Sequence, residues 1–321
     1  MAVFTKLLEA DFSQILSEYN IGSLISFSGI SEGIENTNYI LETDIQKFIF
    51  TIYEKRVSEE DLPFFINLML ELNKNNYPCP LPIAKNDNSY IGKFNGKNYL
   101  IVSMLKGKWP RNIGNNEVYK AGKFLAKLHI NSEKLPKNIA RKNSMAYDFW
   151  RDLFNKISSE TEKNFAPSFD KINNAFNIIQ NNWPKNLPSG IIHADYFPDN
   201  VLFENDEVSG VIDFYMSCND FYAYDLAITL NAWCFERDFS FNYTKAKELF
   251  EGYNSIRKLS SEEISAMPIL AIGASLRFLS TRLYDYFNRV EGAVVNVKNP
   301  VEYIEKLKFH MQINSPKEYG L

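Results

Sequence analysis

The stretch that decides the fold reads His193-Ala194-Asp195-Tyr196-Phe197-Pro198-Asp199-Asn200, and Ile212-Asp213-Phe214 follows it after a predicted hairpin. Four polar residues stand in a fixed order within it: His193, Asp195, Asn200 and Asp213. Two β-favouring runs, residues 201–203 and 208–212, form the hairpin. Any one of these residues alone fits a core histidine or a loop cap, but the ordered set is much harder to obtain by chance.

The order H-x-D-x-x-x-x-N, with an Asp after a hairpin, is similar to the catalytic loop of kinases. In that loop a carboxylate accepts the proton of the substrate hydroxyl, and hard oxygen donors hold Mg²⁺ against the nucleotide phosphates. We therefore predict that Asp195 is catalytic and that Asn200 and Asp213 bind Mg²⁺. His193 is expected to hold the loop in place and not to transfer protons.

A helix is predicted to begin at Tyr224-Asp225-Leu226-Ala227. Asp225 fits a plain N-cap there, a role that contributes about 1 kcal/mol. In small-molecule kinases that the chain resembles, an Asp at this place also braces the catalytic loop. The two interpretations are compatible, and neither makes Asp225 a direct catalyst. His129 and His310 are given no role.

The composition is that of an ordinary globular protein of 321 residues, 45% hydrophobic and 23% charged, with a net charge of −4. A weakly acidic chain lacks the basic face of a general nucleic-acid binder, so no nucleic-acid partner is expected.

Cys79, Cys218 and Cys234 are odd in number and widely spaced, which argues against a disulfide framework or a zinc site. They are expected to be small buried apolar residues in a reducing compartment. The N-terminus lacks the order of a signal peptide, and the longest apolar stretch is too short to span a bilayer, so we expect a cytoplasmic protein without a membrane partner.

The pattern along the chain predicts an α+β, bilobal, protein-kinase-like fold. Short β-favouring runs dominate the first hundred residues, interrupted by a helix that Ser58-Glu59-Glu60-Asp61 opens as a capping box. Helical patterns prevail afterwards, over Glu117–His129 and over residues 262–288, which Ser260 and Glu263 cap. We expect a nucleotide-binding lobe over residues 1–104, with an antiparallel sheet and a helix. A larger, mainly helical lobe for catalysis and substrate binding is expected over residues 105–321.

The predicted nucleotide-binding residues differ from those of protein kinases. The stretch Gly33-Ile34-Glu35-Asn36-Thr37-Asn38 lies between two predicted strands and offers backbone N–H groups to phosphates, but it is not a Walker A loop. Protein kinases carry a Lys in the next long strand, and the position aligned with it here is Thr51. Lys55, just beyond, is either a substitute or a solvated surface charge, and we favour the latter. Adenine is expected to pair with backbone groups of the connector Ser103-Met104-Leu105, although Met104 fits a core position equally well.

Together these segments resemble the aminoglycoside-phosphotransferase-like superfamily, the small-molecule relatives of protein kinases. The resemblance runs almost end to end, and within the superfamily the chain is similar to the homoserine kinase branch. The catalytic segment is specific to the superfamily, whereas Glu35-Asn36-Thr37-Asn38 and Asn231-Ala232-Trp233-Cys234-Phe235-Glu236 point to the branch. Tyr215 stands where protein kinases have the Gly after Asp-Phe, so a mobile activation segment is not indicated.

The resemblance implies an enzyme that uses ATP and Mg²⁺ to phosphorylate the hydroxyl of L-homoserine, a step towards threonine. The alternative is a kinase of another small hydroxylated metabolite, such as an aminoglycoside, choline or methylthioribose. A catalytically dead nucleotide-binding module is a third hypothesis, disfavoured because both Asp195 and Asp213 are present. The oligomeric state is not readable from the sequence.

The substrate implied by the resemblance is a small zwitterion, which restricts its partners. Its carboxylate needs a cationic group, for which Arg277 and Arg282 are candidates, because arginine offers bidentate geometry. Its ammonium needs a carboxylate, for which Asp220 and Glu236 are candidates. Trp233 is a candidate pocket wall. The charged candidates also fit interhelical salt bridges, and Trp233 also fits a core position.

Overall fold

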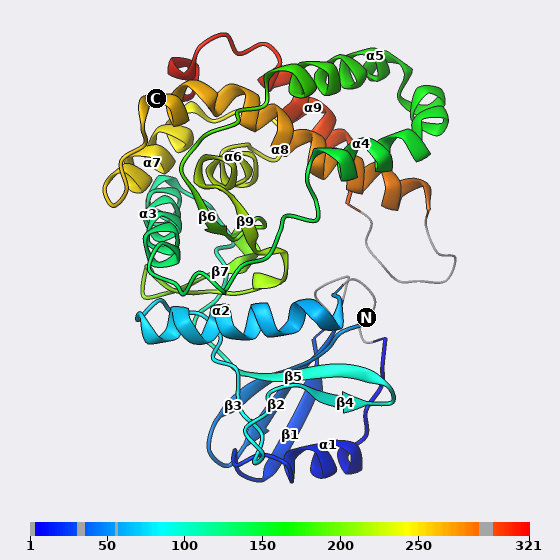
Figure 1. The fold of residues 1–321 in the computed structure, drawn as a ribbon, viewed down its shortest axis with the longest axis vertical. Coiled ribbons are helices and arrows are strands. Elements are labelled where there is room, and N and C mark those ends of the chain that lie inside the picture. The colour runs from blue at the N-terminus through cyan, green and yellow to red at the C-terminus, as the bar shows by residue number, and fades with distance from the viewer. Residues whose placement is uncertain (1–3, 31–35, 55–56, 289–297) are drawn as a thin grey trace. The chain divides into compact units, whose positions relative to one another are not determined.

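The computed structural model describes residues 4–30, 36–54, 57–288 and 298–321 (Figure 1). The described residues fall into two compact units. The first, here called the sheet unit, runs to Gly107 and also includes Ser209–Tyr215. The second, the helical unit, contains Lys108–Val208, the chain from Met216 to residue 288, and the chain from residue 298 to Leu321. Asp213 therefore belongs to the sheet unit, and Asp195 and Asn200 belong to the helical unit.

The sheet unit is built on a five-stranded antiparallel sheet with the strand order β1-β2-β3-β5-β4. Alternating burial along β2 shows that one face of the sheet is covered, and Phe12 supplies part of that cover, with its ring centroid 5.1 Å from that of Tyr39 and 5.4 Å from that of Phe50. The elements are α1 (Glu9–Leu16), β1 (Leu24–Gly29), β2 (Thr37–Thr43), β3 (Lys47–Ile52), η1 (Glu59–Asp61), α2 (Leu62–Lys74), β4 (Gly92–Phe94) and β5 (Lys97–Ser103). This antiparallel sheet with its helices confirms the predicted fold class.

The helix after the third strand begins where the sequence predicts. The Ser58 side chain accepts a hydrogen bond from the backbone N–H of Glu60 and opens a short 3₁₀ turn, which α2 continues. Pro63 lies in the first turn of α2, where a backbone N–H has no partner within the helix, so proline loses no hydrogen bond there. The helix buries Phe65, Met69 and other apolar residues along one face.

The helical unit is organised around α8, the long helix drawn in orange in Figure 1, which packs against α4, α5, α6 and α9. Ser260 and Glu263 form its predicted capping box. By length and composition α8 could cross a membrane, but its buried Glu263, Arg277 and Arg282 pack inside the protein, as in the core helix of a globular domain. The helices are α3 (Asn115–Ser132), α4 (Tyr147–Lys156), α5 (Ser158–Asn182), α6 (Tyr222–Trp233), α7 (Tyr243–Asn254), α8 (Ser261–Phe287), α9 (Val301–His310) and the 3₁₀ turn η4 (Pro316–Tyr319).

Helices α3 and α7 cross at van der Waals distance because two glycines lie at the crossing. A Cβ atom on Gly122 would lie 2.3 Å from the carbonyl oxygen of Leu249, and one on Gly252 would lie 2.0 Å from that of Tyr119. Neither position accepts a larger residue without separating the helices. This crossing fixes α3, which carries His129, relative to the rest of the helical unit.

Short strands flank the predicted catalytic segment. Strand β6 (Ser189–Ile192) pairs in antiparallel fashion with β9 (Cys218–Phe221), and the hairpin β7 (Val201–Glu204) and β8 (Glu207–Val211) follows the 3₁₀ turn η2 (Pro198–Asn200). A further 3₁₀ turn, η3 (Phe214–Met216), leads into β9. Residues 193–200, called the catalytic loop below, thus begin at the buried end of β6 and end at the start of the hairpin. All three cysteines are free and buried, as predicted.

Candidate active site

The side chains of the catalytic loop hold one another in place. Asn200 donates from Nδ2 to the carbonyl oxygen of Asp195 at 2.9 Å and to its Oδ2 at 3.3 Å. The backbone N–H of Asp195 donates to Nδ1 of His193 at 3.3 Å. Asp195 therefore has both its backbone and its carboxylate oriented by residues that the sequence pattern singled out.

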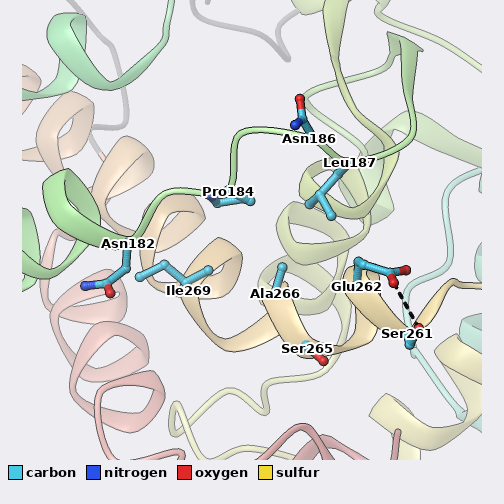
Figure 2. Close-up of a pocket in the computed structure, with 9 residues that line it drawn as sticks. All are labelled: Asn182, Pro184, Asn186, Leu187, Ser261, Glu262, Ser265, Ala266 and Ile269. Atoms are coloured by element: carbon cyan, nitrogen blue, oxygen red, sulfur yellow. Dashed lines mark hydrogen bonds between the residues drawn. The ribbon is translucent and has the colours of Figure 1, made fainter.

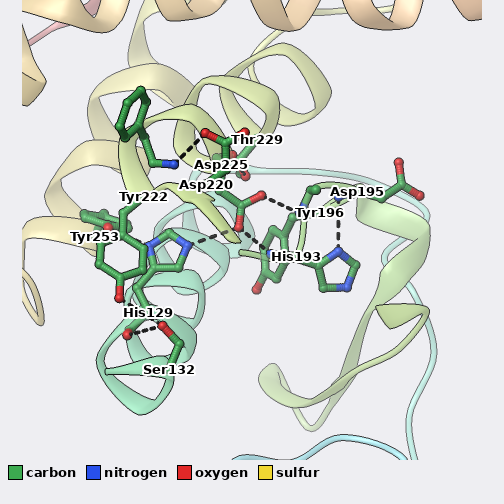
Figure 3. Close-up of polar contacts among 12 residues, drawn as sticks. His129, Ser132, His193, Asp195, Tyr196, Asp220, Tyr222, Asp225, Thr229 and Tyr253 are labelled. Carbon is green, nitrogen blue, oxygen red and sulfur yellow. Dashed lines mark hydrogen bonds and ion pairs between the residues drawn. The ribbon is translucent and has the colours of Figure 1, made fainter. Parts of the chain in front are cut away.

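Asp225 braces the same loop from inside α6 (Figure 3). Its Oδ2 accepts the backbone N–H of His193 and its Oδ1 that of Ala194, both at 2.8 Å. Phe221 occupies the N-cap position of α6, so the N-cap interpretation of Asp225 is wrong; its side chain turns to the loop and not to its own helix. Burial acts to raise the pKa of Asp225, but the bonds from His129 and from the loop hold that pKa below its ordinary value.

His129 has a role that the sequence did not predict. This fully buried ring on α3 contacts Oδ2 of Asp225 through Nε2 at 3.1 Å and the hydroxyl of Tyr253 through Nδ1 at 2.7 Å (Figure 3). Burial lowers the pKa of His129, and the bond to Asp225 opposes this only in part. The ring is therefore neutral at physiological pH, with Nε2–H donating to Asp225 and Nδ1 accepting from Tyr253. His129 fixes the carboxylate that braces the catalytic loop.

Two predicted substrate-binding residues contact the backbone of the catalytic loop. The indole N–H of Trp233 donates to the carbonyl oxygen of Tyr196 at 2.9 Å, and Trp233 is only 1% exposed. Arg277 donates from Nη1 to the carbonyl oxygen of Ala194 at 2.6 Å and is 3% exposed. Both side chains therefore support the loop, whatever else they do.

The carboxylate candidates differ in their surroundings. Asp220 is half-buried and accepts hydrogen bonds at 2.7 Å from Nδ2 of Asn143 and from the N–H of Phe221. Burial raises the pKa of Asp220, although the charge of Arg277 opposes the rise. Glu236 instead pairs with Lys245 at 2.6 Å, which holds the pKa of Glu236 low. The structure thus neutralises Glu236 within the protein and leaves the Asp220 carboxyl in a partly desolvated place.

Arg282 lies in a charged cluster between α8 and α9. It pairs with Glu302, which also binds Lys306 at 2.6 Å, so two cations share one carboxylate. The Arg282 guanidinium lies 4.3 Å from the ring centroid of Tyr303. The Tyr303 hydroxyl is buried and has no hydrogen-bond partner among the described residues. Burial raises the pKa of Tyr303, the charge of Arg282 opposes that rise, and the charge of Asp195 adds to it.

Asp213 is exposed in the sheet unit and adopts a φ of +65°, so its carboxylate leaves the chain at a sharp bend after β8. Two residues later, Tyr215 accepts a hydrogen bond at 2.8 Å from the Tyr53 hydroxyl. The Tyr215 ring also packs edge-on against Phe65, with centroids 5.5 Å apart. The residue that replaces the protein-kinase Gly is therefore anchored within the sheet unit.

Of the nucleotide candidates on β2 and β3, Thr37 and Thr51 are buried and Asn38 is half-buried. Gly33 and Lys55 lie outside the described residues, and Asn36 is 8% exposed. Thr51 donates to Oδ1 of Asn38, its partner across the strands, at 2.7 Å. The Thr37 hydroxyl donates to Glu54 at 2.6 Å and accepts the N–H groups of Phe4 and Thr5. Its side chain thus ties the N-terminal segment to the sheet.

The connector candidates continue from the end of β5. Ser103 donates its N–H to the carbonyl oxygen of Leu81 and accepts the N–H of Leu81 on its hydroxyl, both at 2.9 Å. Met104 donates its N–H to the carbonyl oxygen of Lys47 at 3.3 Å. Met104 is 40% exposed, which disfavours the alternative that it is a core residue. Leu105 is partly exposed and covers Gly210 within the same unit.

Among the described residues, the candidate site coincides neither with a metal-binding cluster nor with the surface hollow described here. Among the described residues, no group of three or more His, Cys, Asp or Glu side chains could hold a metal ion. A surface hollow lies between the segment before β6 and the first turns of α8 (Figure 2). Its lining consists of Asn182, Pro184, Asn186, Leu187, Ser261, Glu262, Ser265, Ala266 and Ile269. None of the predicted site residues lines this hollow.

Sequence reasoning missed several residues that complete the site. His129 lies in a regular helical pattern, where a histidine looks like any core residue, and Asn143 lies in an irregular segment without a motif. Only the tertiary contacts with Asp225 and Asp220 reveal them. A signal was available for His129 alone, because a titratable ring on an otherwise apolar helix face needs a polar partner.

Comparison with known proteins agrees with this arrangement. The model of the family described as "Phosphotransferase enzyme family" matches residues 26–259. A homoserine kinase of Rhizobium etli is 46% identical over 321 residues, covering 100% of this chain and 99% of the relative. A homoserine kinase of Mesorhizobium japonicum is 45% identical over 324 residues, covering 100% of both chains.

Solved structures share the fold at low sequence identity. The microcompartment-associated aminopropanol kinase gives a TM-score of 0.70 at 15% identity, with 94% of each chain covered. The spectinomycin phosphotransferase in complex with ADP and spectinomycin gives 0.69 at 13% identity, with 98% of each chain covered. The choline kinase of Cryptosporidium parvum gives 0.66 at 16% identity, with 95% of each chain covered. These likenesses establish the bilobal aminoglycoside-phosphotransferase-like fold.

Proposed function

We propose how this chain, which belongs to the phosphotransferase enzyme family and within it to the homoserine kinases, uses its catalytic loop to phosphorylate L-homoserine. The reaction converts ATP and L-homoserine into ADP and O-phospho-L-homoserine. The observation that carries the assignment is the 45–46% identity to homoserine kinases along the whole chain, together with an intact Asp195, Asn200 and Asp213. Threonine biosynthesis follows as its metabolic role, and we propose a cytoplasmic location.

Asp195 is the proposed catalytic carboxylate. It accepts the proton of the substrate hydroxyl as that oxygen bonds to the γ-phosphorus, and the bond from the γ-phosphorus to the bridging oxygen of ADP breaks. Phosphoryl transfer depends mainly on in-line positioning and on stabilising charge. The hydrogen bond from Asn200 to Oδ2 supports this role, because it orients the carboxylate before the substrate arrives.

Asn200 and Asp213 are the proposed Mg²⁺ ligands. The donor set fits, since an amide oxygen and a carboxylate are hard oxygen ligands and Mg²⁺ keeps its remaining positions for water and phosphate oxygens. Nδ2 of Asn200 donates its hydrogen bonds to Asp195, so Oδ1 is the atom of that amide proposed to bind the ion. When bound, the ion neutralises charge on the phosphates.

The nucleotide is proposed to bind the sheet unit at the residues that the sequence indicated. Gly33, Asn36, Thr37 and Asn38 would serve the phosphates chiefly through their backbone, because the Thr37 and Asn38 side chains already have partners. Thr51 would line the same phosphate-binding region. At the connector, the amides of Ser103 and Met104 are paired within the sheet unit, so adenine recognition falls to their carbonyl oxygens and to the backbone of Leu105.

The substrate amino acid is proposed to bind between Arg282 and Asp220. Arg282 and Lys306 share Glu302, and burial lowers the pKa of Lys306, so the guanidinium of Arg282 is the cation proposed to bind the carboxylate. Asp220 gains most from a cationic ligand, because burial already disfavours its charged form and a neighbouring ammonium restores it. Glu236 is the weaker candidate, since Lys245 already neutralises it.

A substrate panel tests the assignment. Release of ADP from Mg²⁺-ATP is measured with L-homoserine, L-serine, L-threonine, choline, methylthioribose and an aminoglycoside. Selective turnover of L-homoserine is expected. Preferred turnover of another acceptor would overturn the homoserine assignment while leaving the phosphotransferase fold and the catalytic carboxylate in place.

A further inference from the structure

We propose that Arg277 is a positioning residue for Asp195, holding the peptide unit before it from α8, and not a ligand of the substrate carboxylate. The inference rests on the proposed function only in that Asp195 is taken as the catalytic carboxylate. It concerns a helix outside the catalytic motif, and it gives this arginine a role other than the substrate ligand or interhelical salt bridge that the sequence suggested.

The conformation of Ala194 supplies the first observation. Ala194 has a φ of +62°, in the left-handed region that a residue with a Cβ atom rarely adopts. Such conformations persist where the surroundings hold them in place, and they cluster at active sites. A rotation at Ala194 would displace Asp195 directly, because the two residues share a peptide bond.

The contacts of Ala194 show what holds it. Asp225 on α6 accepts its N–H at 2.8 Å, and Arg277 on α8 donates to its carbonyl oxygen at 2.6 Å. One helix thus anchors the amide on one side of the strained residue, and another anchors the carbonyl on the other side. Ala194 is itself 1% exposed, so water does not replace either bond.

The burial of Arg277 supplies an independent observation. The side chain is 3% exposed, and its Nε has no hydrogen-bond partner among the described residues. Its Nη2 lies 3.9 Å from Sδ of Met145. The shortest hydrogen bond that this guanidinium makes is directed at the loop backbone, which is what a positioning role requires. Burial raises the pKa of the Asp220 carboxyl, and the charge of Arg277 is one of the effects that oppose this rise.

Steady-state kinetics distinguish the two roles. We would measure kcat and KM for L-homoserine in Arg277→Met and Arg277→Lys, with the exposed Arg237→Met as the matched control. A positioning role predicts that kcat falls about 100-fold in Arg277→Met, the effect of a small misplacement of a catalytic group. The KM for L-homoserine is then expected to change by less than about threefold. Arg277→Lys keeps one donor and should fall between Arg277→Met and the wild type in kcat.

A second variant makes the test specific to the strained residue and guards against a simple folding defect. Glycine adopts positive φ without steric cost, so Ala194→Gly should lessen the need for the arginine. We expect the fall in kcat caused by Arg277→Met to be at least about tenfold smaller in the Ala194→Gly background, with thermal unfolding confirming that each variant is folded. This rescue depends on the geometry of the loop and not on general stability.

The outcomes separate this inference from the proposed function. A large rise in KM for L-homoserine with kcat preserved would make Arg277 a substrate ligand and overturn the inference. An equal loss of kcat in both Ala194 backgrounds would also overturn it. Failure of the wild-type enzyme to use L-homoserine would contradict the proposed function alone, since the effect of Arg277→Met can then be measured with whichever acceptor is turned over.

Discussion

Asn200 donates its amide N–H to both the carbonyl oxygen and the carboxylate of Asp195, at 2.9 and 3.3 Å. The residue proposed to hold Mg²⁺ through its oxygen therefore orients the catalytic carboxylate through its nitrogen. An aspartate at this position would keep an oxygen ligand and lose the donor. The two functions of Asn200 can thus be tested separately.

Asn200→Asp is expected to retain binding of Mg²⁺-ATP and to lower kcat by about 100-fold or more, the usual effect of losing one preorganised donor. The added charge also repels Asp195. Titration of the thermal shift with Mg²⁺-ATP reports binding, and ADP release reports kcat. The exposed Asn205→Asp is the control for the added charge. A variant with normal kcat would show that Asn200 does not orient the carboxylate.

Trp233→Phe is expected to lower stability and kcat together while leaving the KM for L-homoserine nearly unchanged. The variant keeps an aromatic ring but leaves the Tyr196 carbonyl without its donor, a loss of about 1–3 kcal/mol for a buried group. Urea unfolding and steady-state kinetics measure both effects, with the exposed Trp109→Phe as control. A selective rise in KM would instead assign Trp233 to the substrate pocket.

Arg282→Lys is expected to raise the KM for L-homoserine more than it lowers kcat. Lysine keeps a charge beside Glu302 but loses the planar, bidentate donor edge that suits a carboxylate. An increase of about tenfold corresponds to one weakened charge-assisted hydrogen bond. Homoserine lactone, which lacks the free carboxylate, serves as competitor: it should inhibit the variant and the wild type equally. Unchanged KM in the variant would place the carboxylate elsewhere.

The stability of the protein is expected to fall as the pH drops below about 6.5, and His310 is one cause. Its Nδ1 contacts the Tyr319 hydroxyl at 2.7 Å and its Nε2 contacts Oδ1 of Asn231 at 3.1 Å, an arrangement that suits the neutral ring. Burial lowers the pKa of His310 to about 3. As the pH falls below about 6.5, His310 becomes protonated in the unfolded chain but stays neutral in the folded chain. The free energy of unfolding therefore falls by about 1 kcal/mol for each pH unit.

Urea unfolding at pH 7.5 and pH 5.5 measures this dependence. His310→Gln removes the titrating group, so its free energy of unfolding should change less between the two pH values than that of the wild type. The change that remains in the variant reports the other groups, including His129, whose pKa is also lowered by burial. Equal changes in both proteins would mean that His310 is protonated in the folded state.

The sequence predicted most of the fold because the signals are local. Ser58 and Ser260 mark helix starts that the structure reproduces: Ser260 forms the predicted capping box, whereas Ser58 caps a 3₁₀ turn through the N–H of Glu60. The alternation of β-branched and aromatic residues marks β2, β3 and β5. Strand β9 was not predicted, because Cys218–Phe221 is short and becomes a strand only by pairing with β6. Helix α1 is likewise short and lacks a strong start signal.

The proposed catalytic motif could be recognised in the sequence because phosphoryl transfer requires fixed residue types at fixed spacing. The residues that support this motif could not be identified from the sequence. Asp225 looks like an N-cap in the sequence and is a brace in the structure, and His129 looks like a core residue and is the partner of that brace. Arg277 and Trp233 were predicted as substrate-binding residues, and only tertiary contacts show that they hold the loop backbone.

The measurement that tests the account most directly is ³¹P NMR of a mixture of Mg²⁺-ATP and L-homoserine with the wild-type enzyme and with Asp195→Asn. We predict that the wild type forms a phosphomonoester signal of O-phospho-L-homoserine together with ADP. Asp195→Asn should form it at least about 100-fold more slowly while ATP still stabilises the folded protein against heat. Phosphorylation of L-homoserine by Asp195→Asn at the wild-type rate would contradict the proposed mechanism.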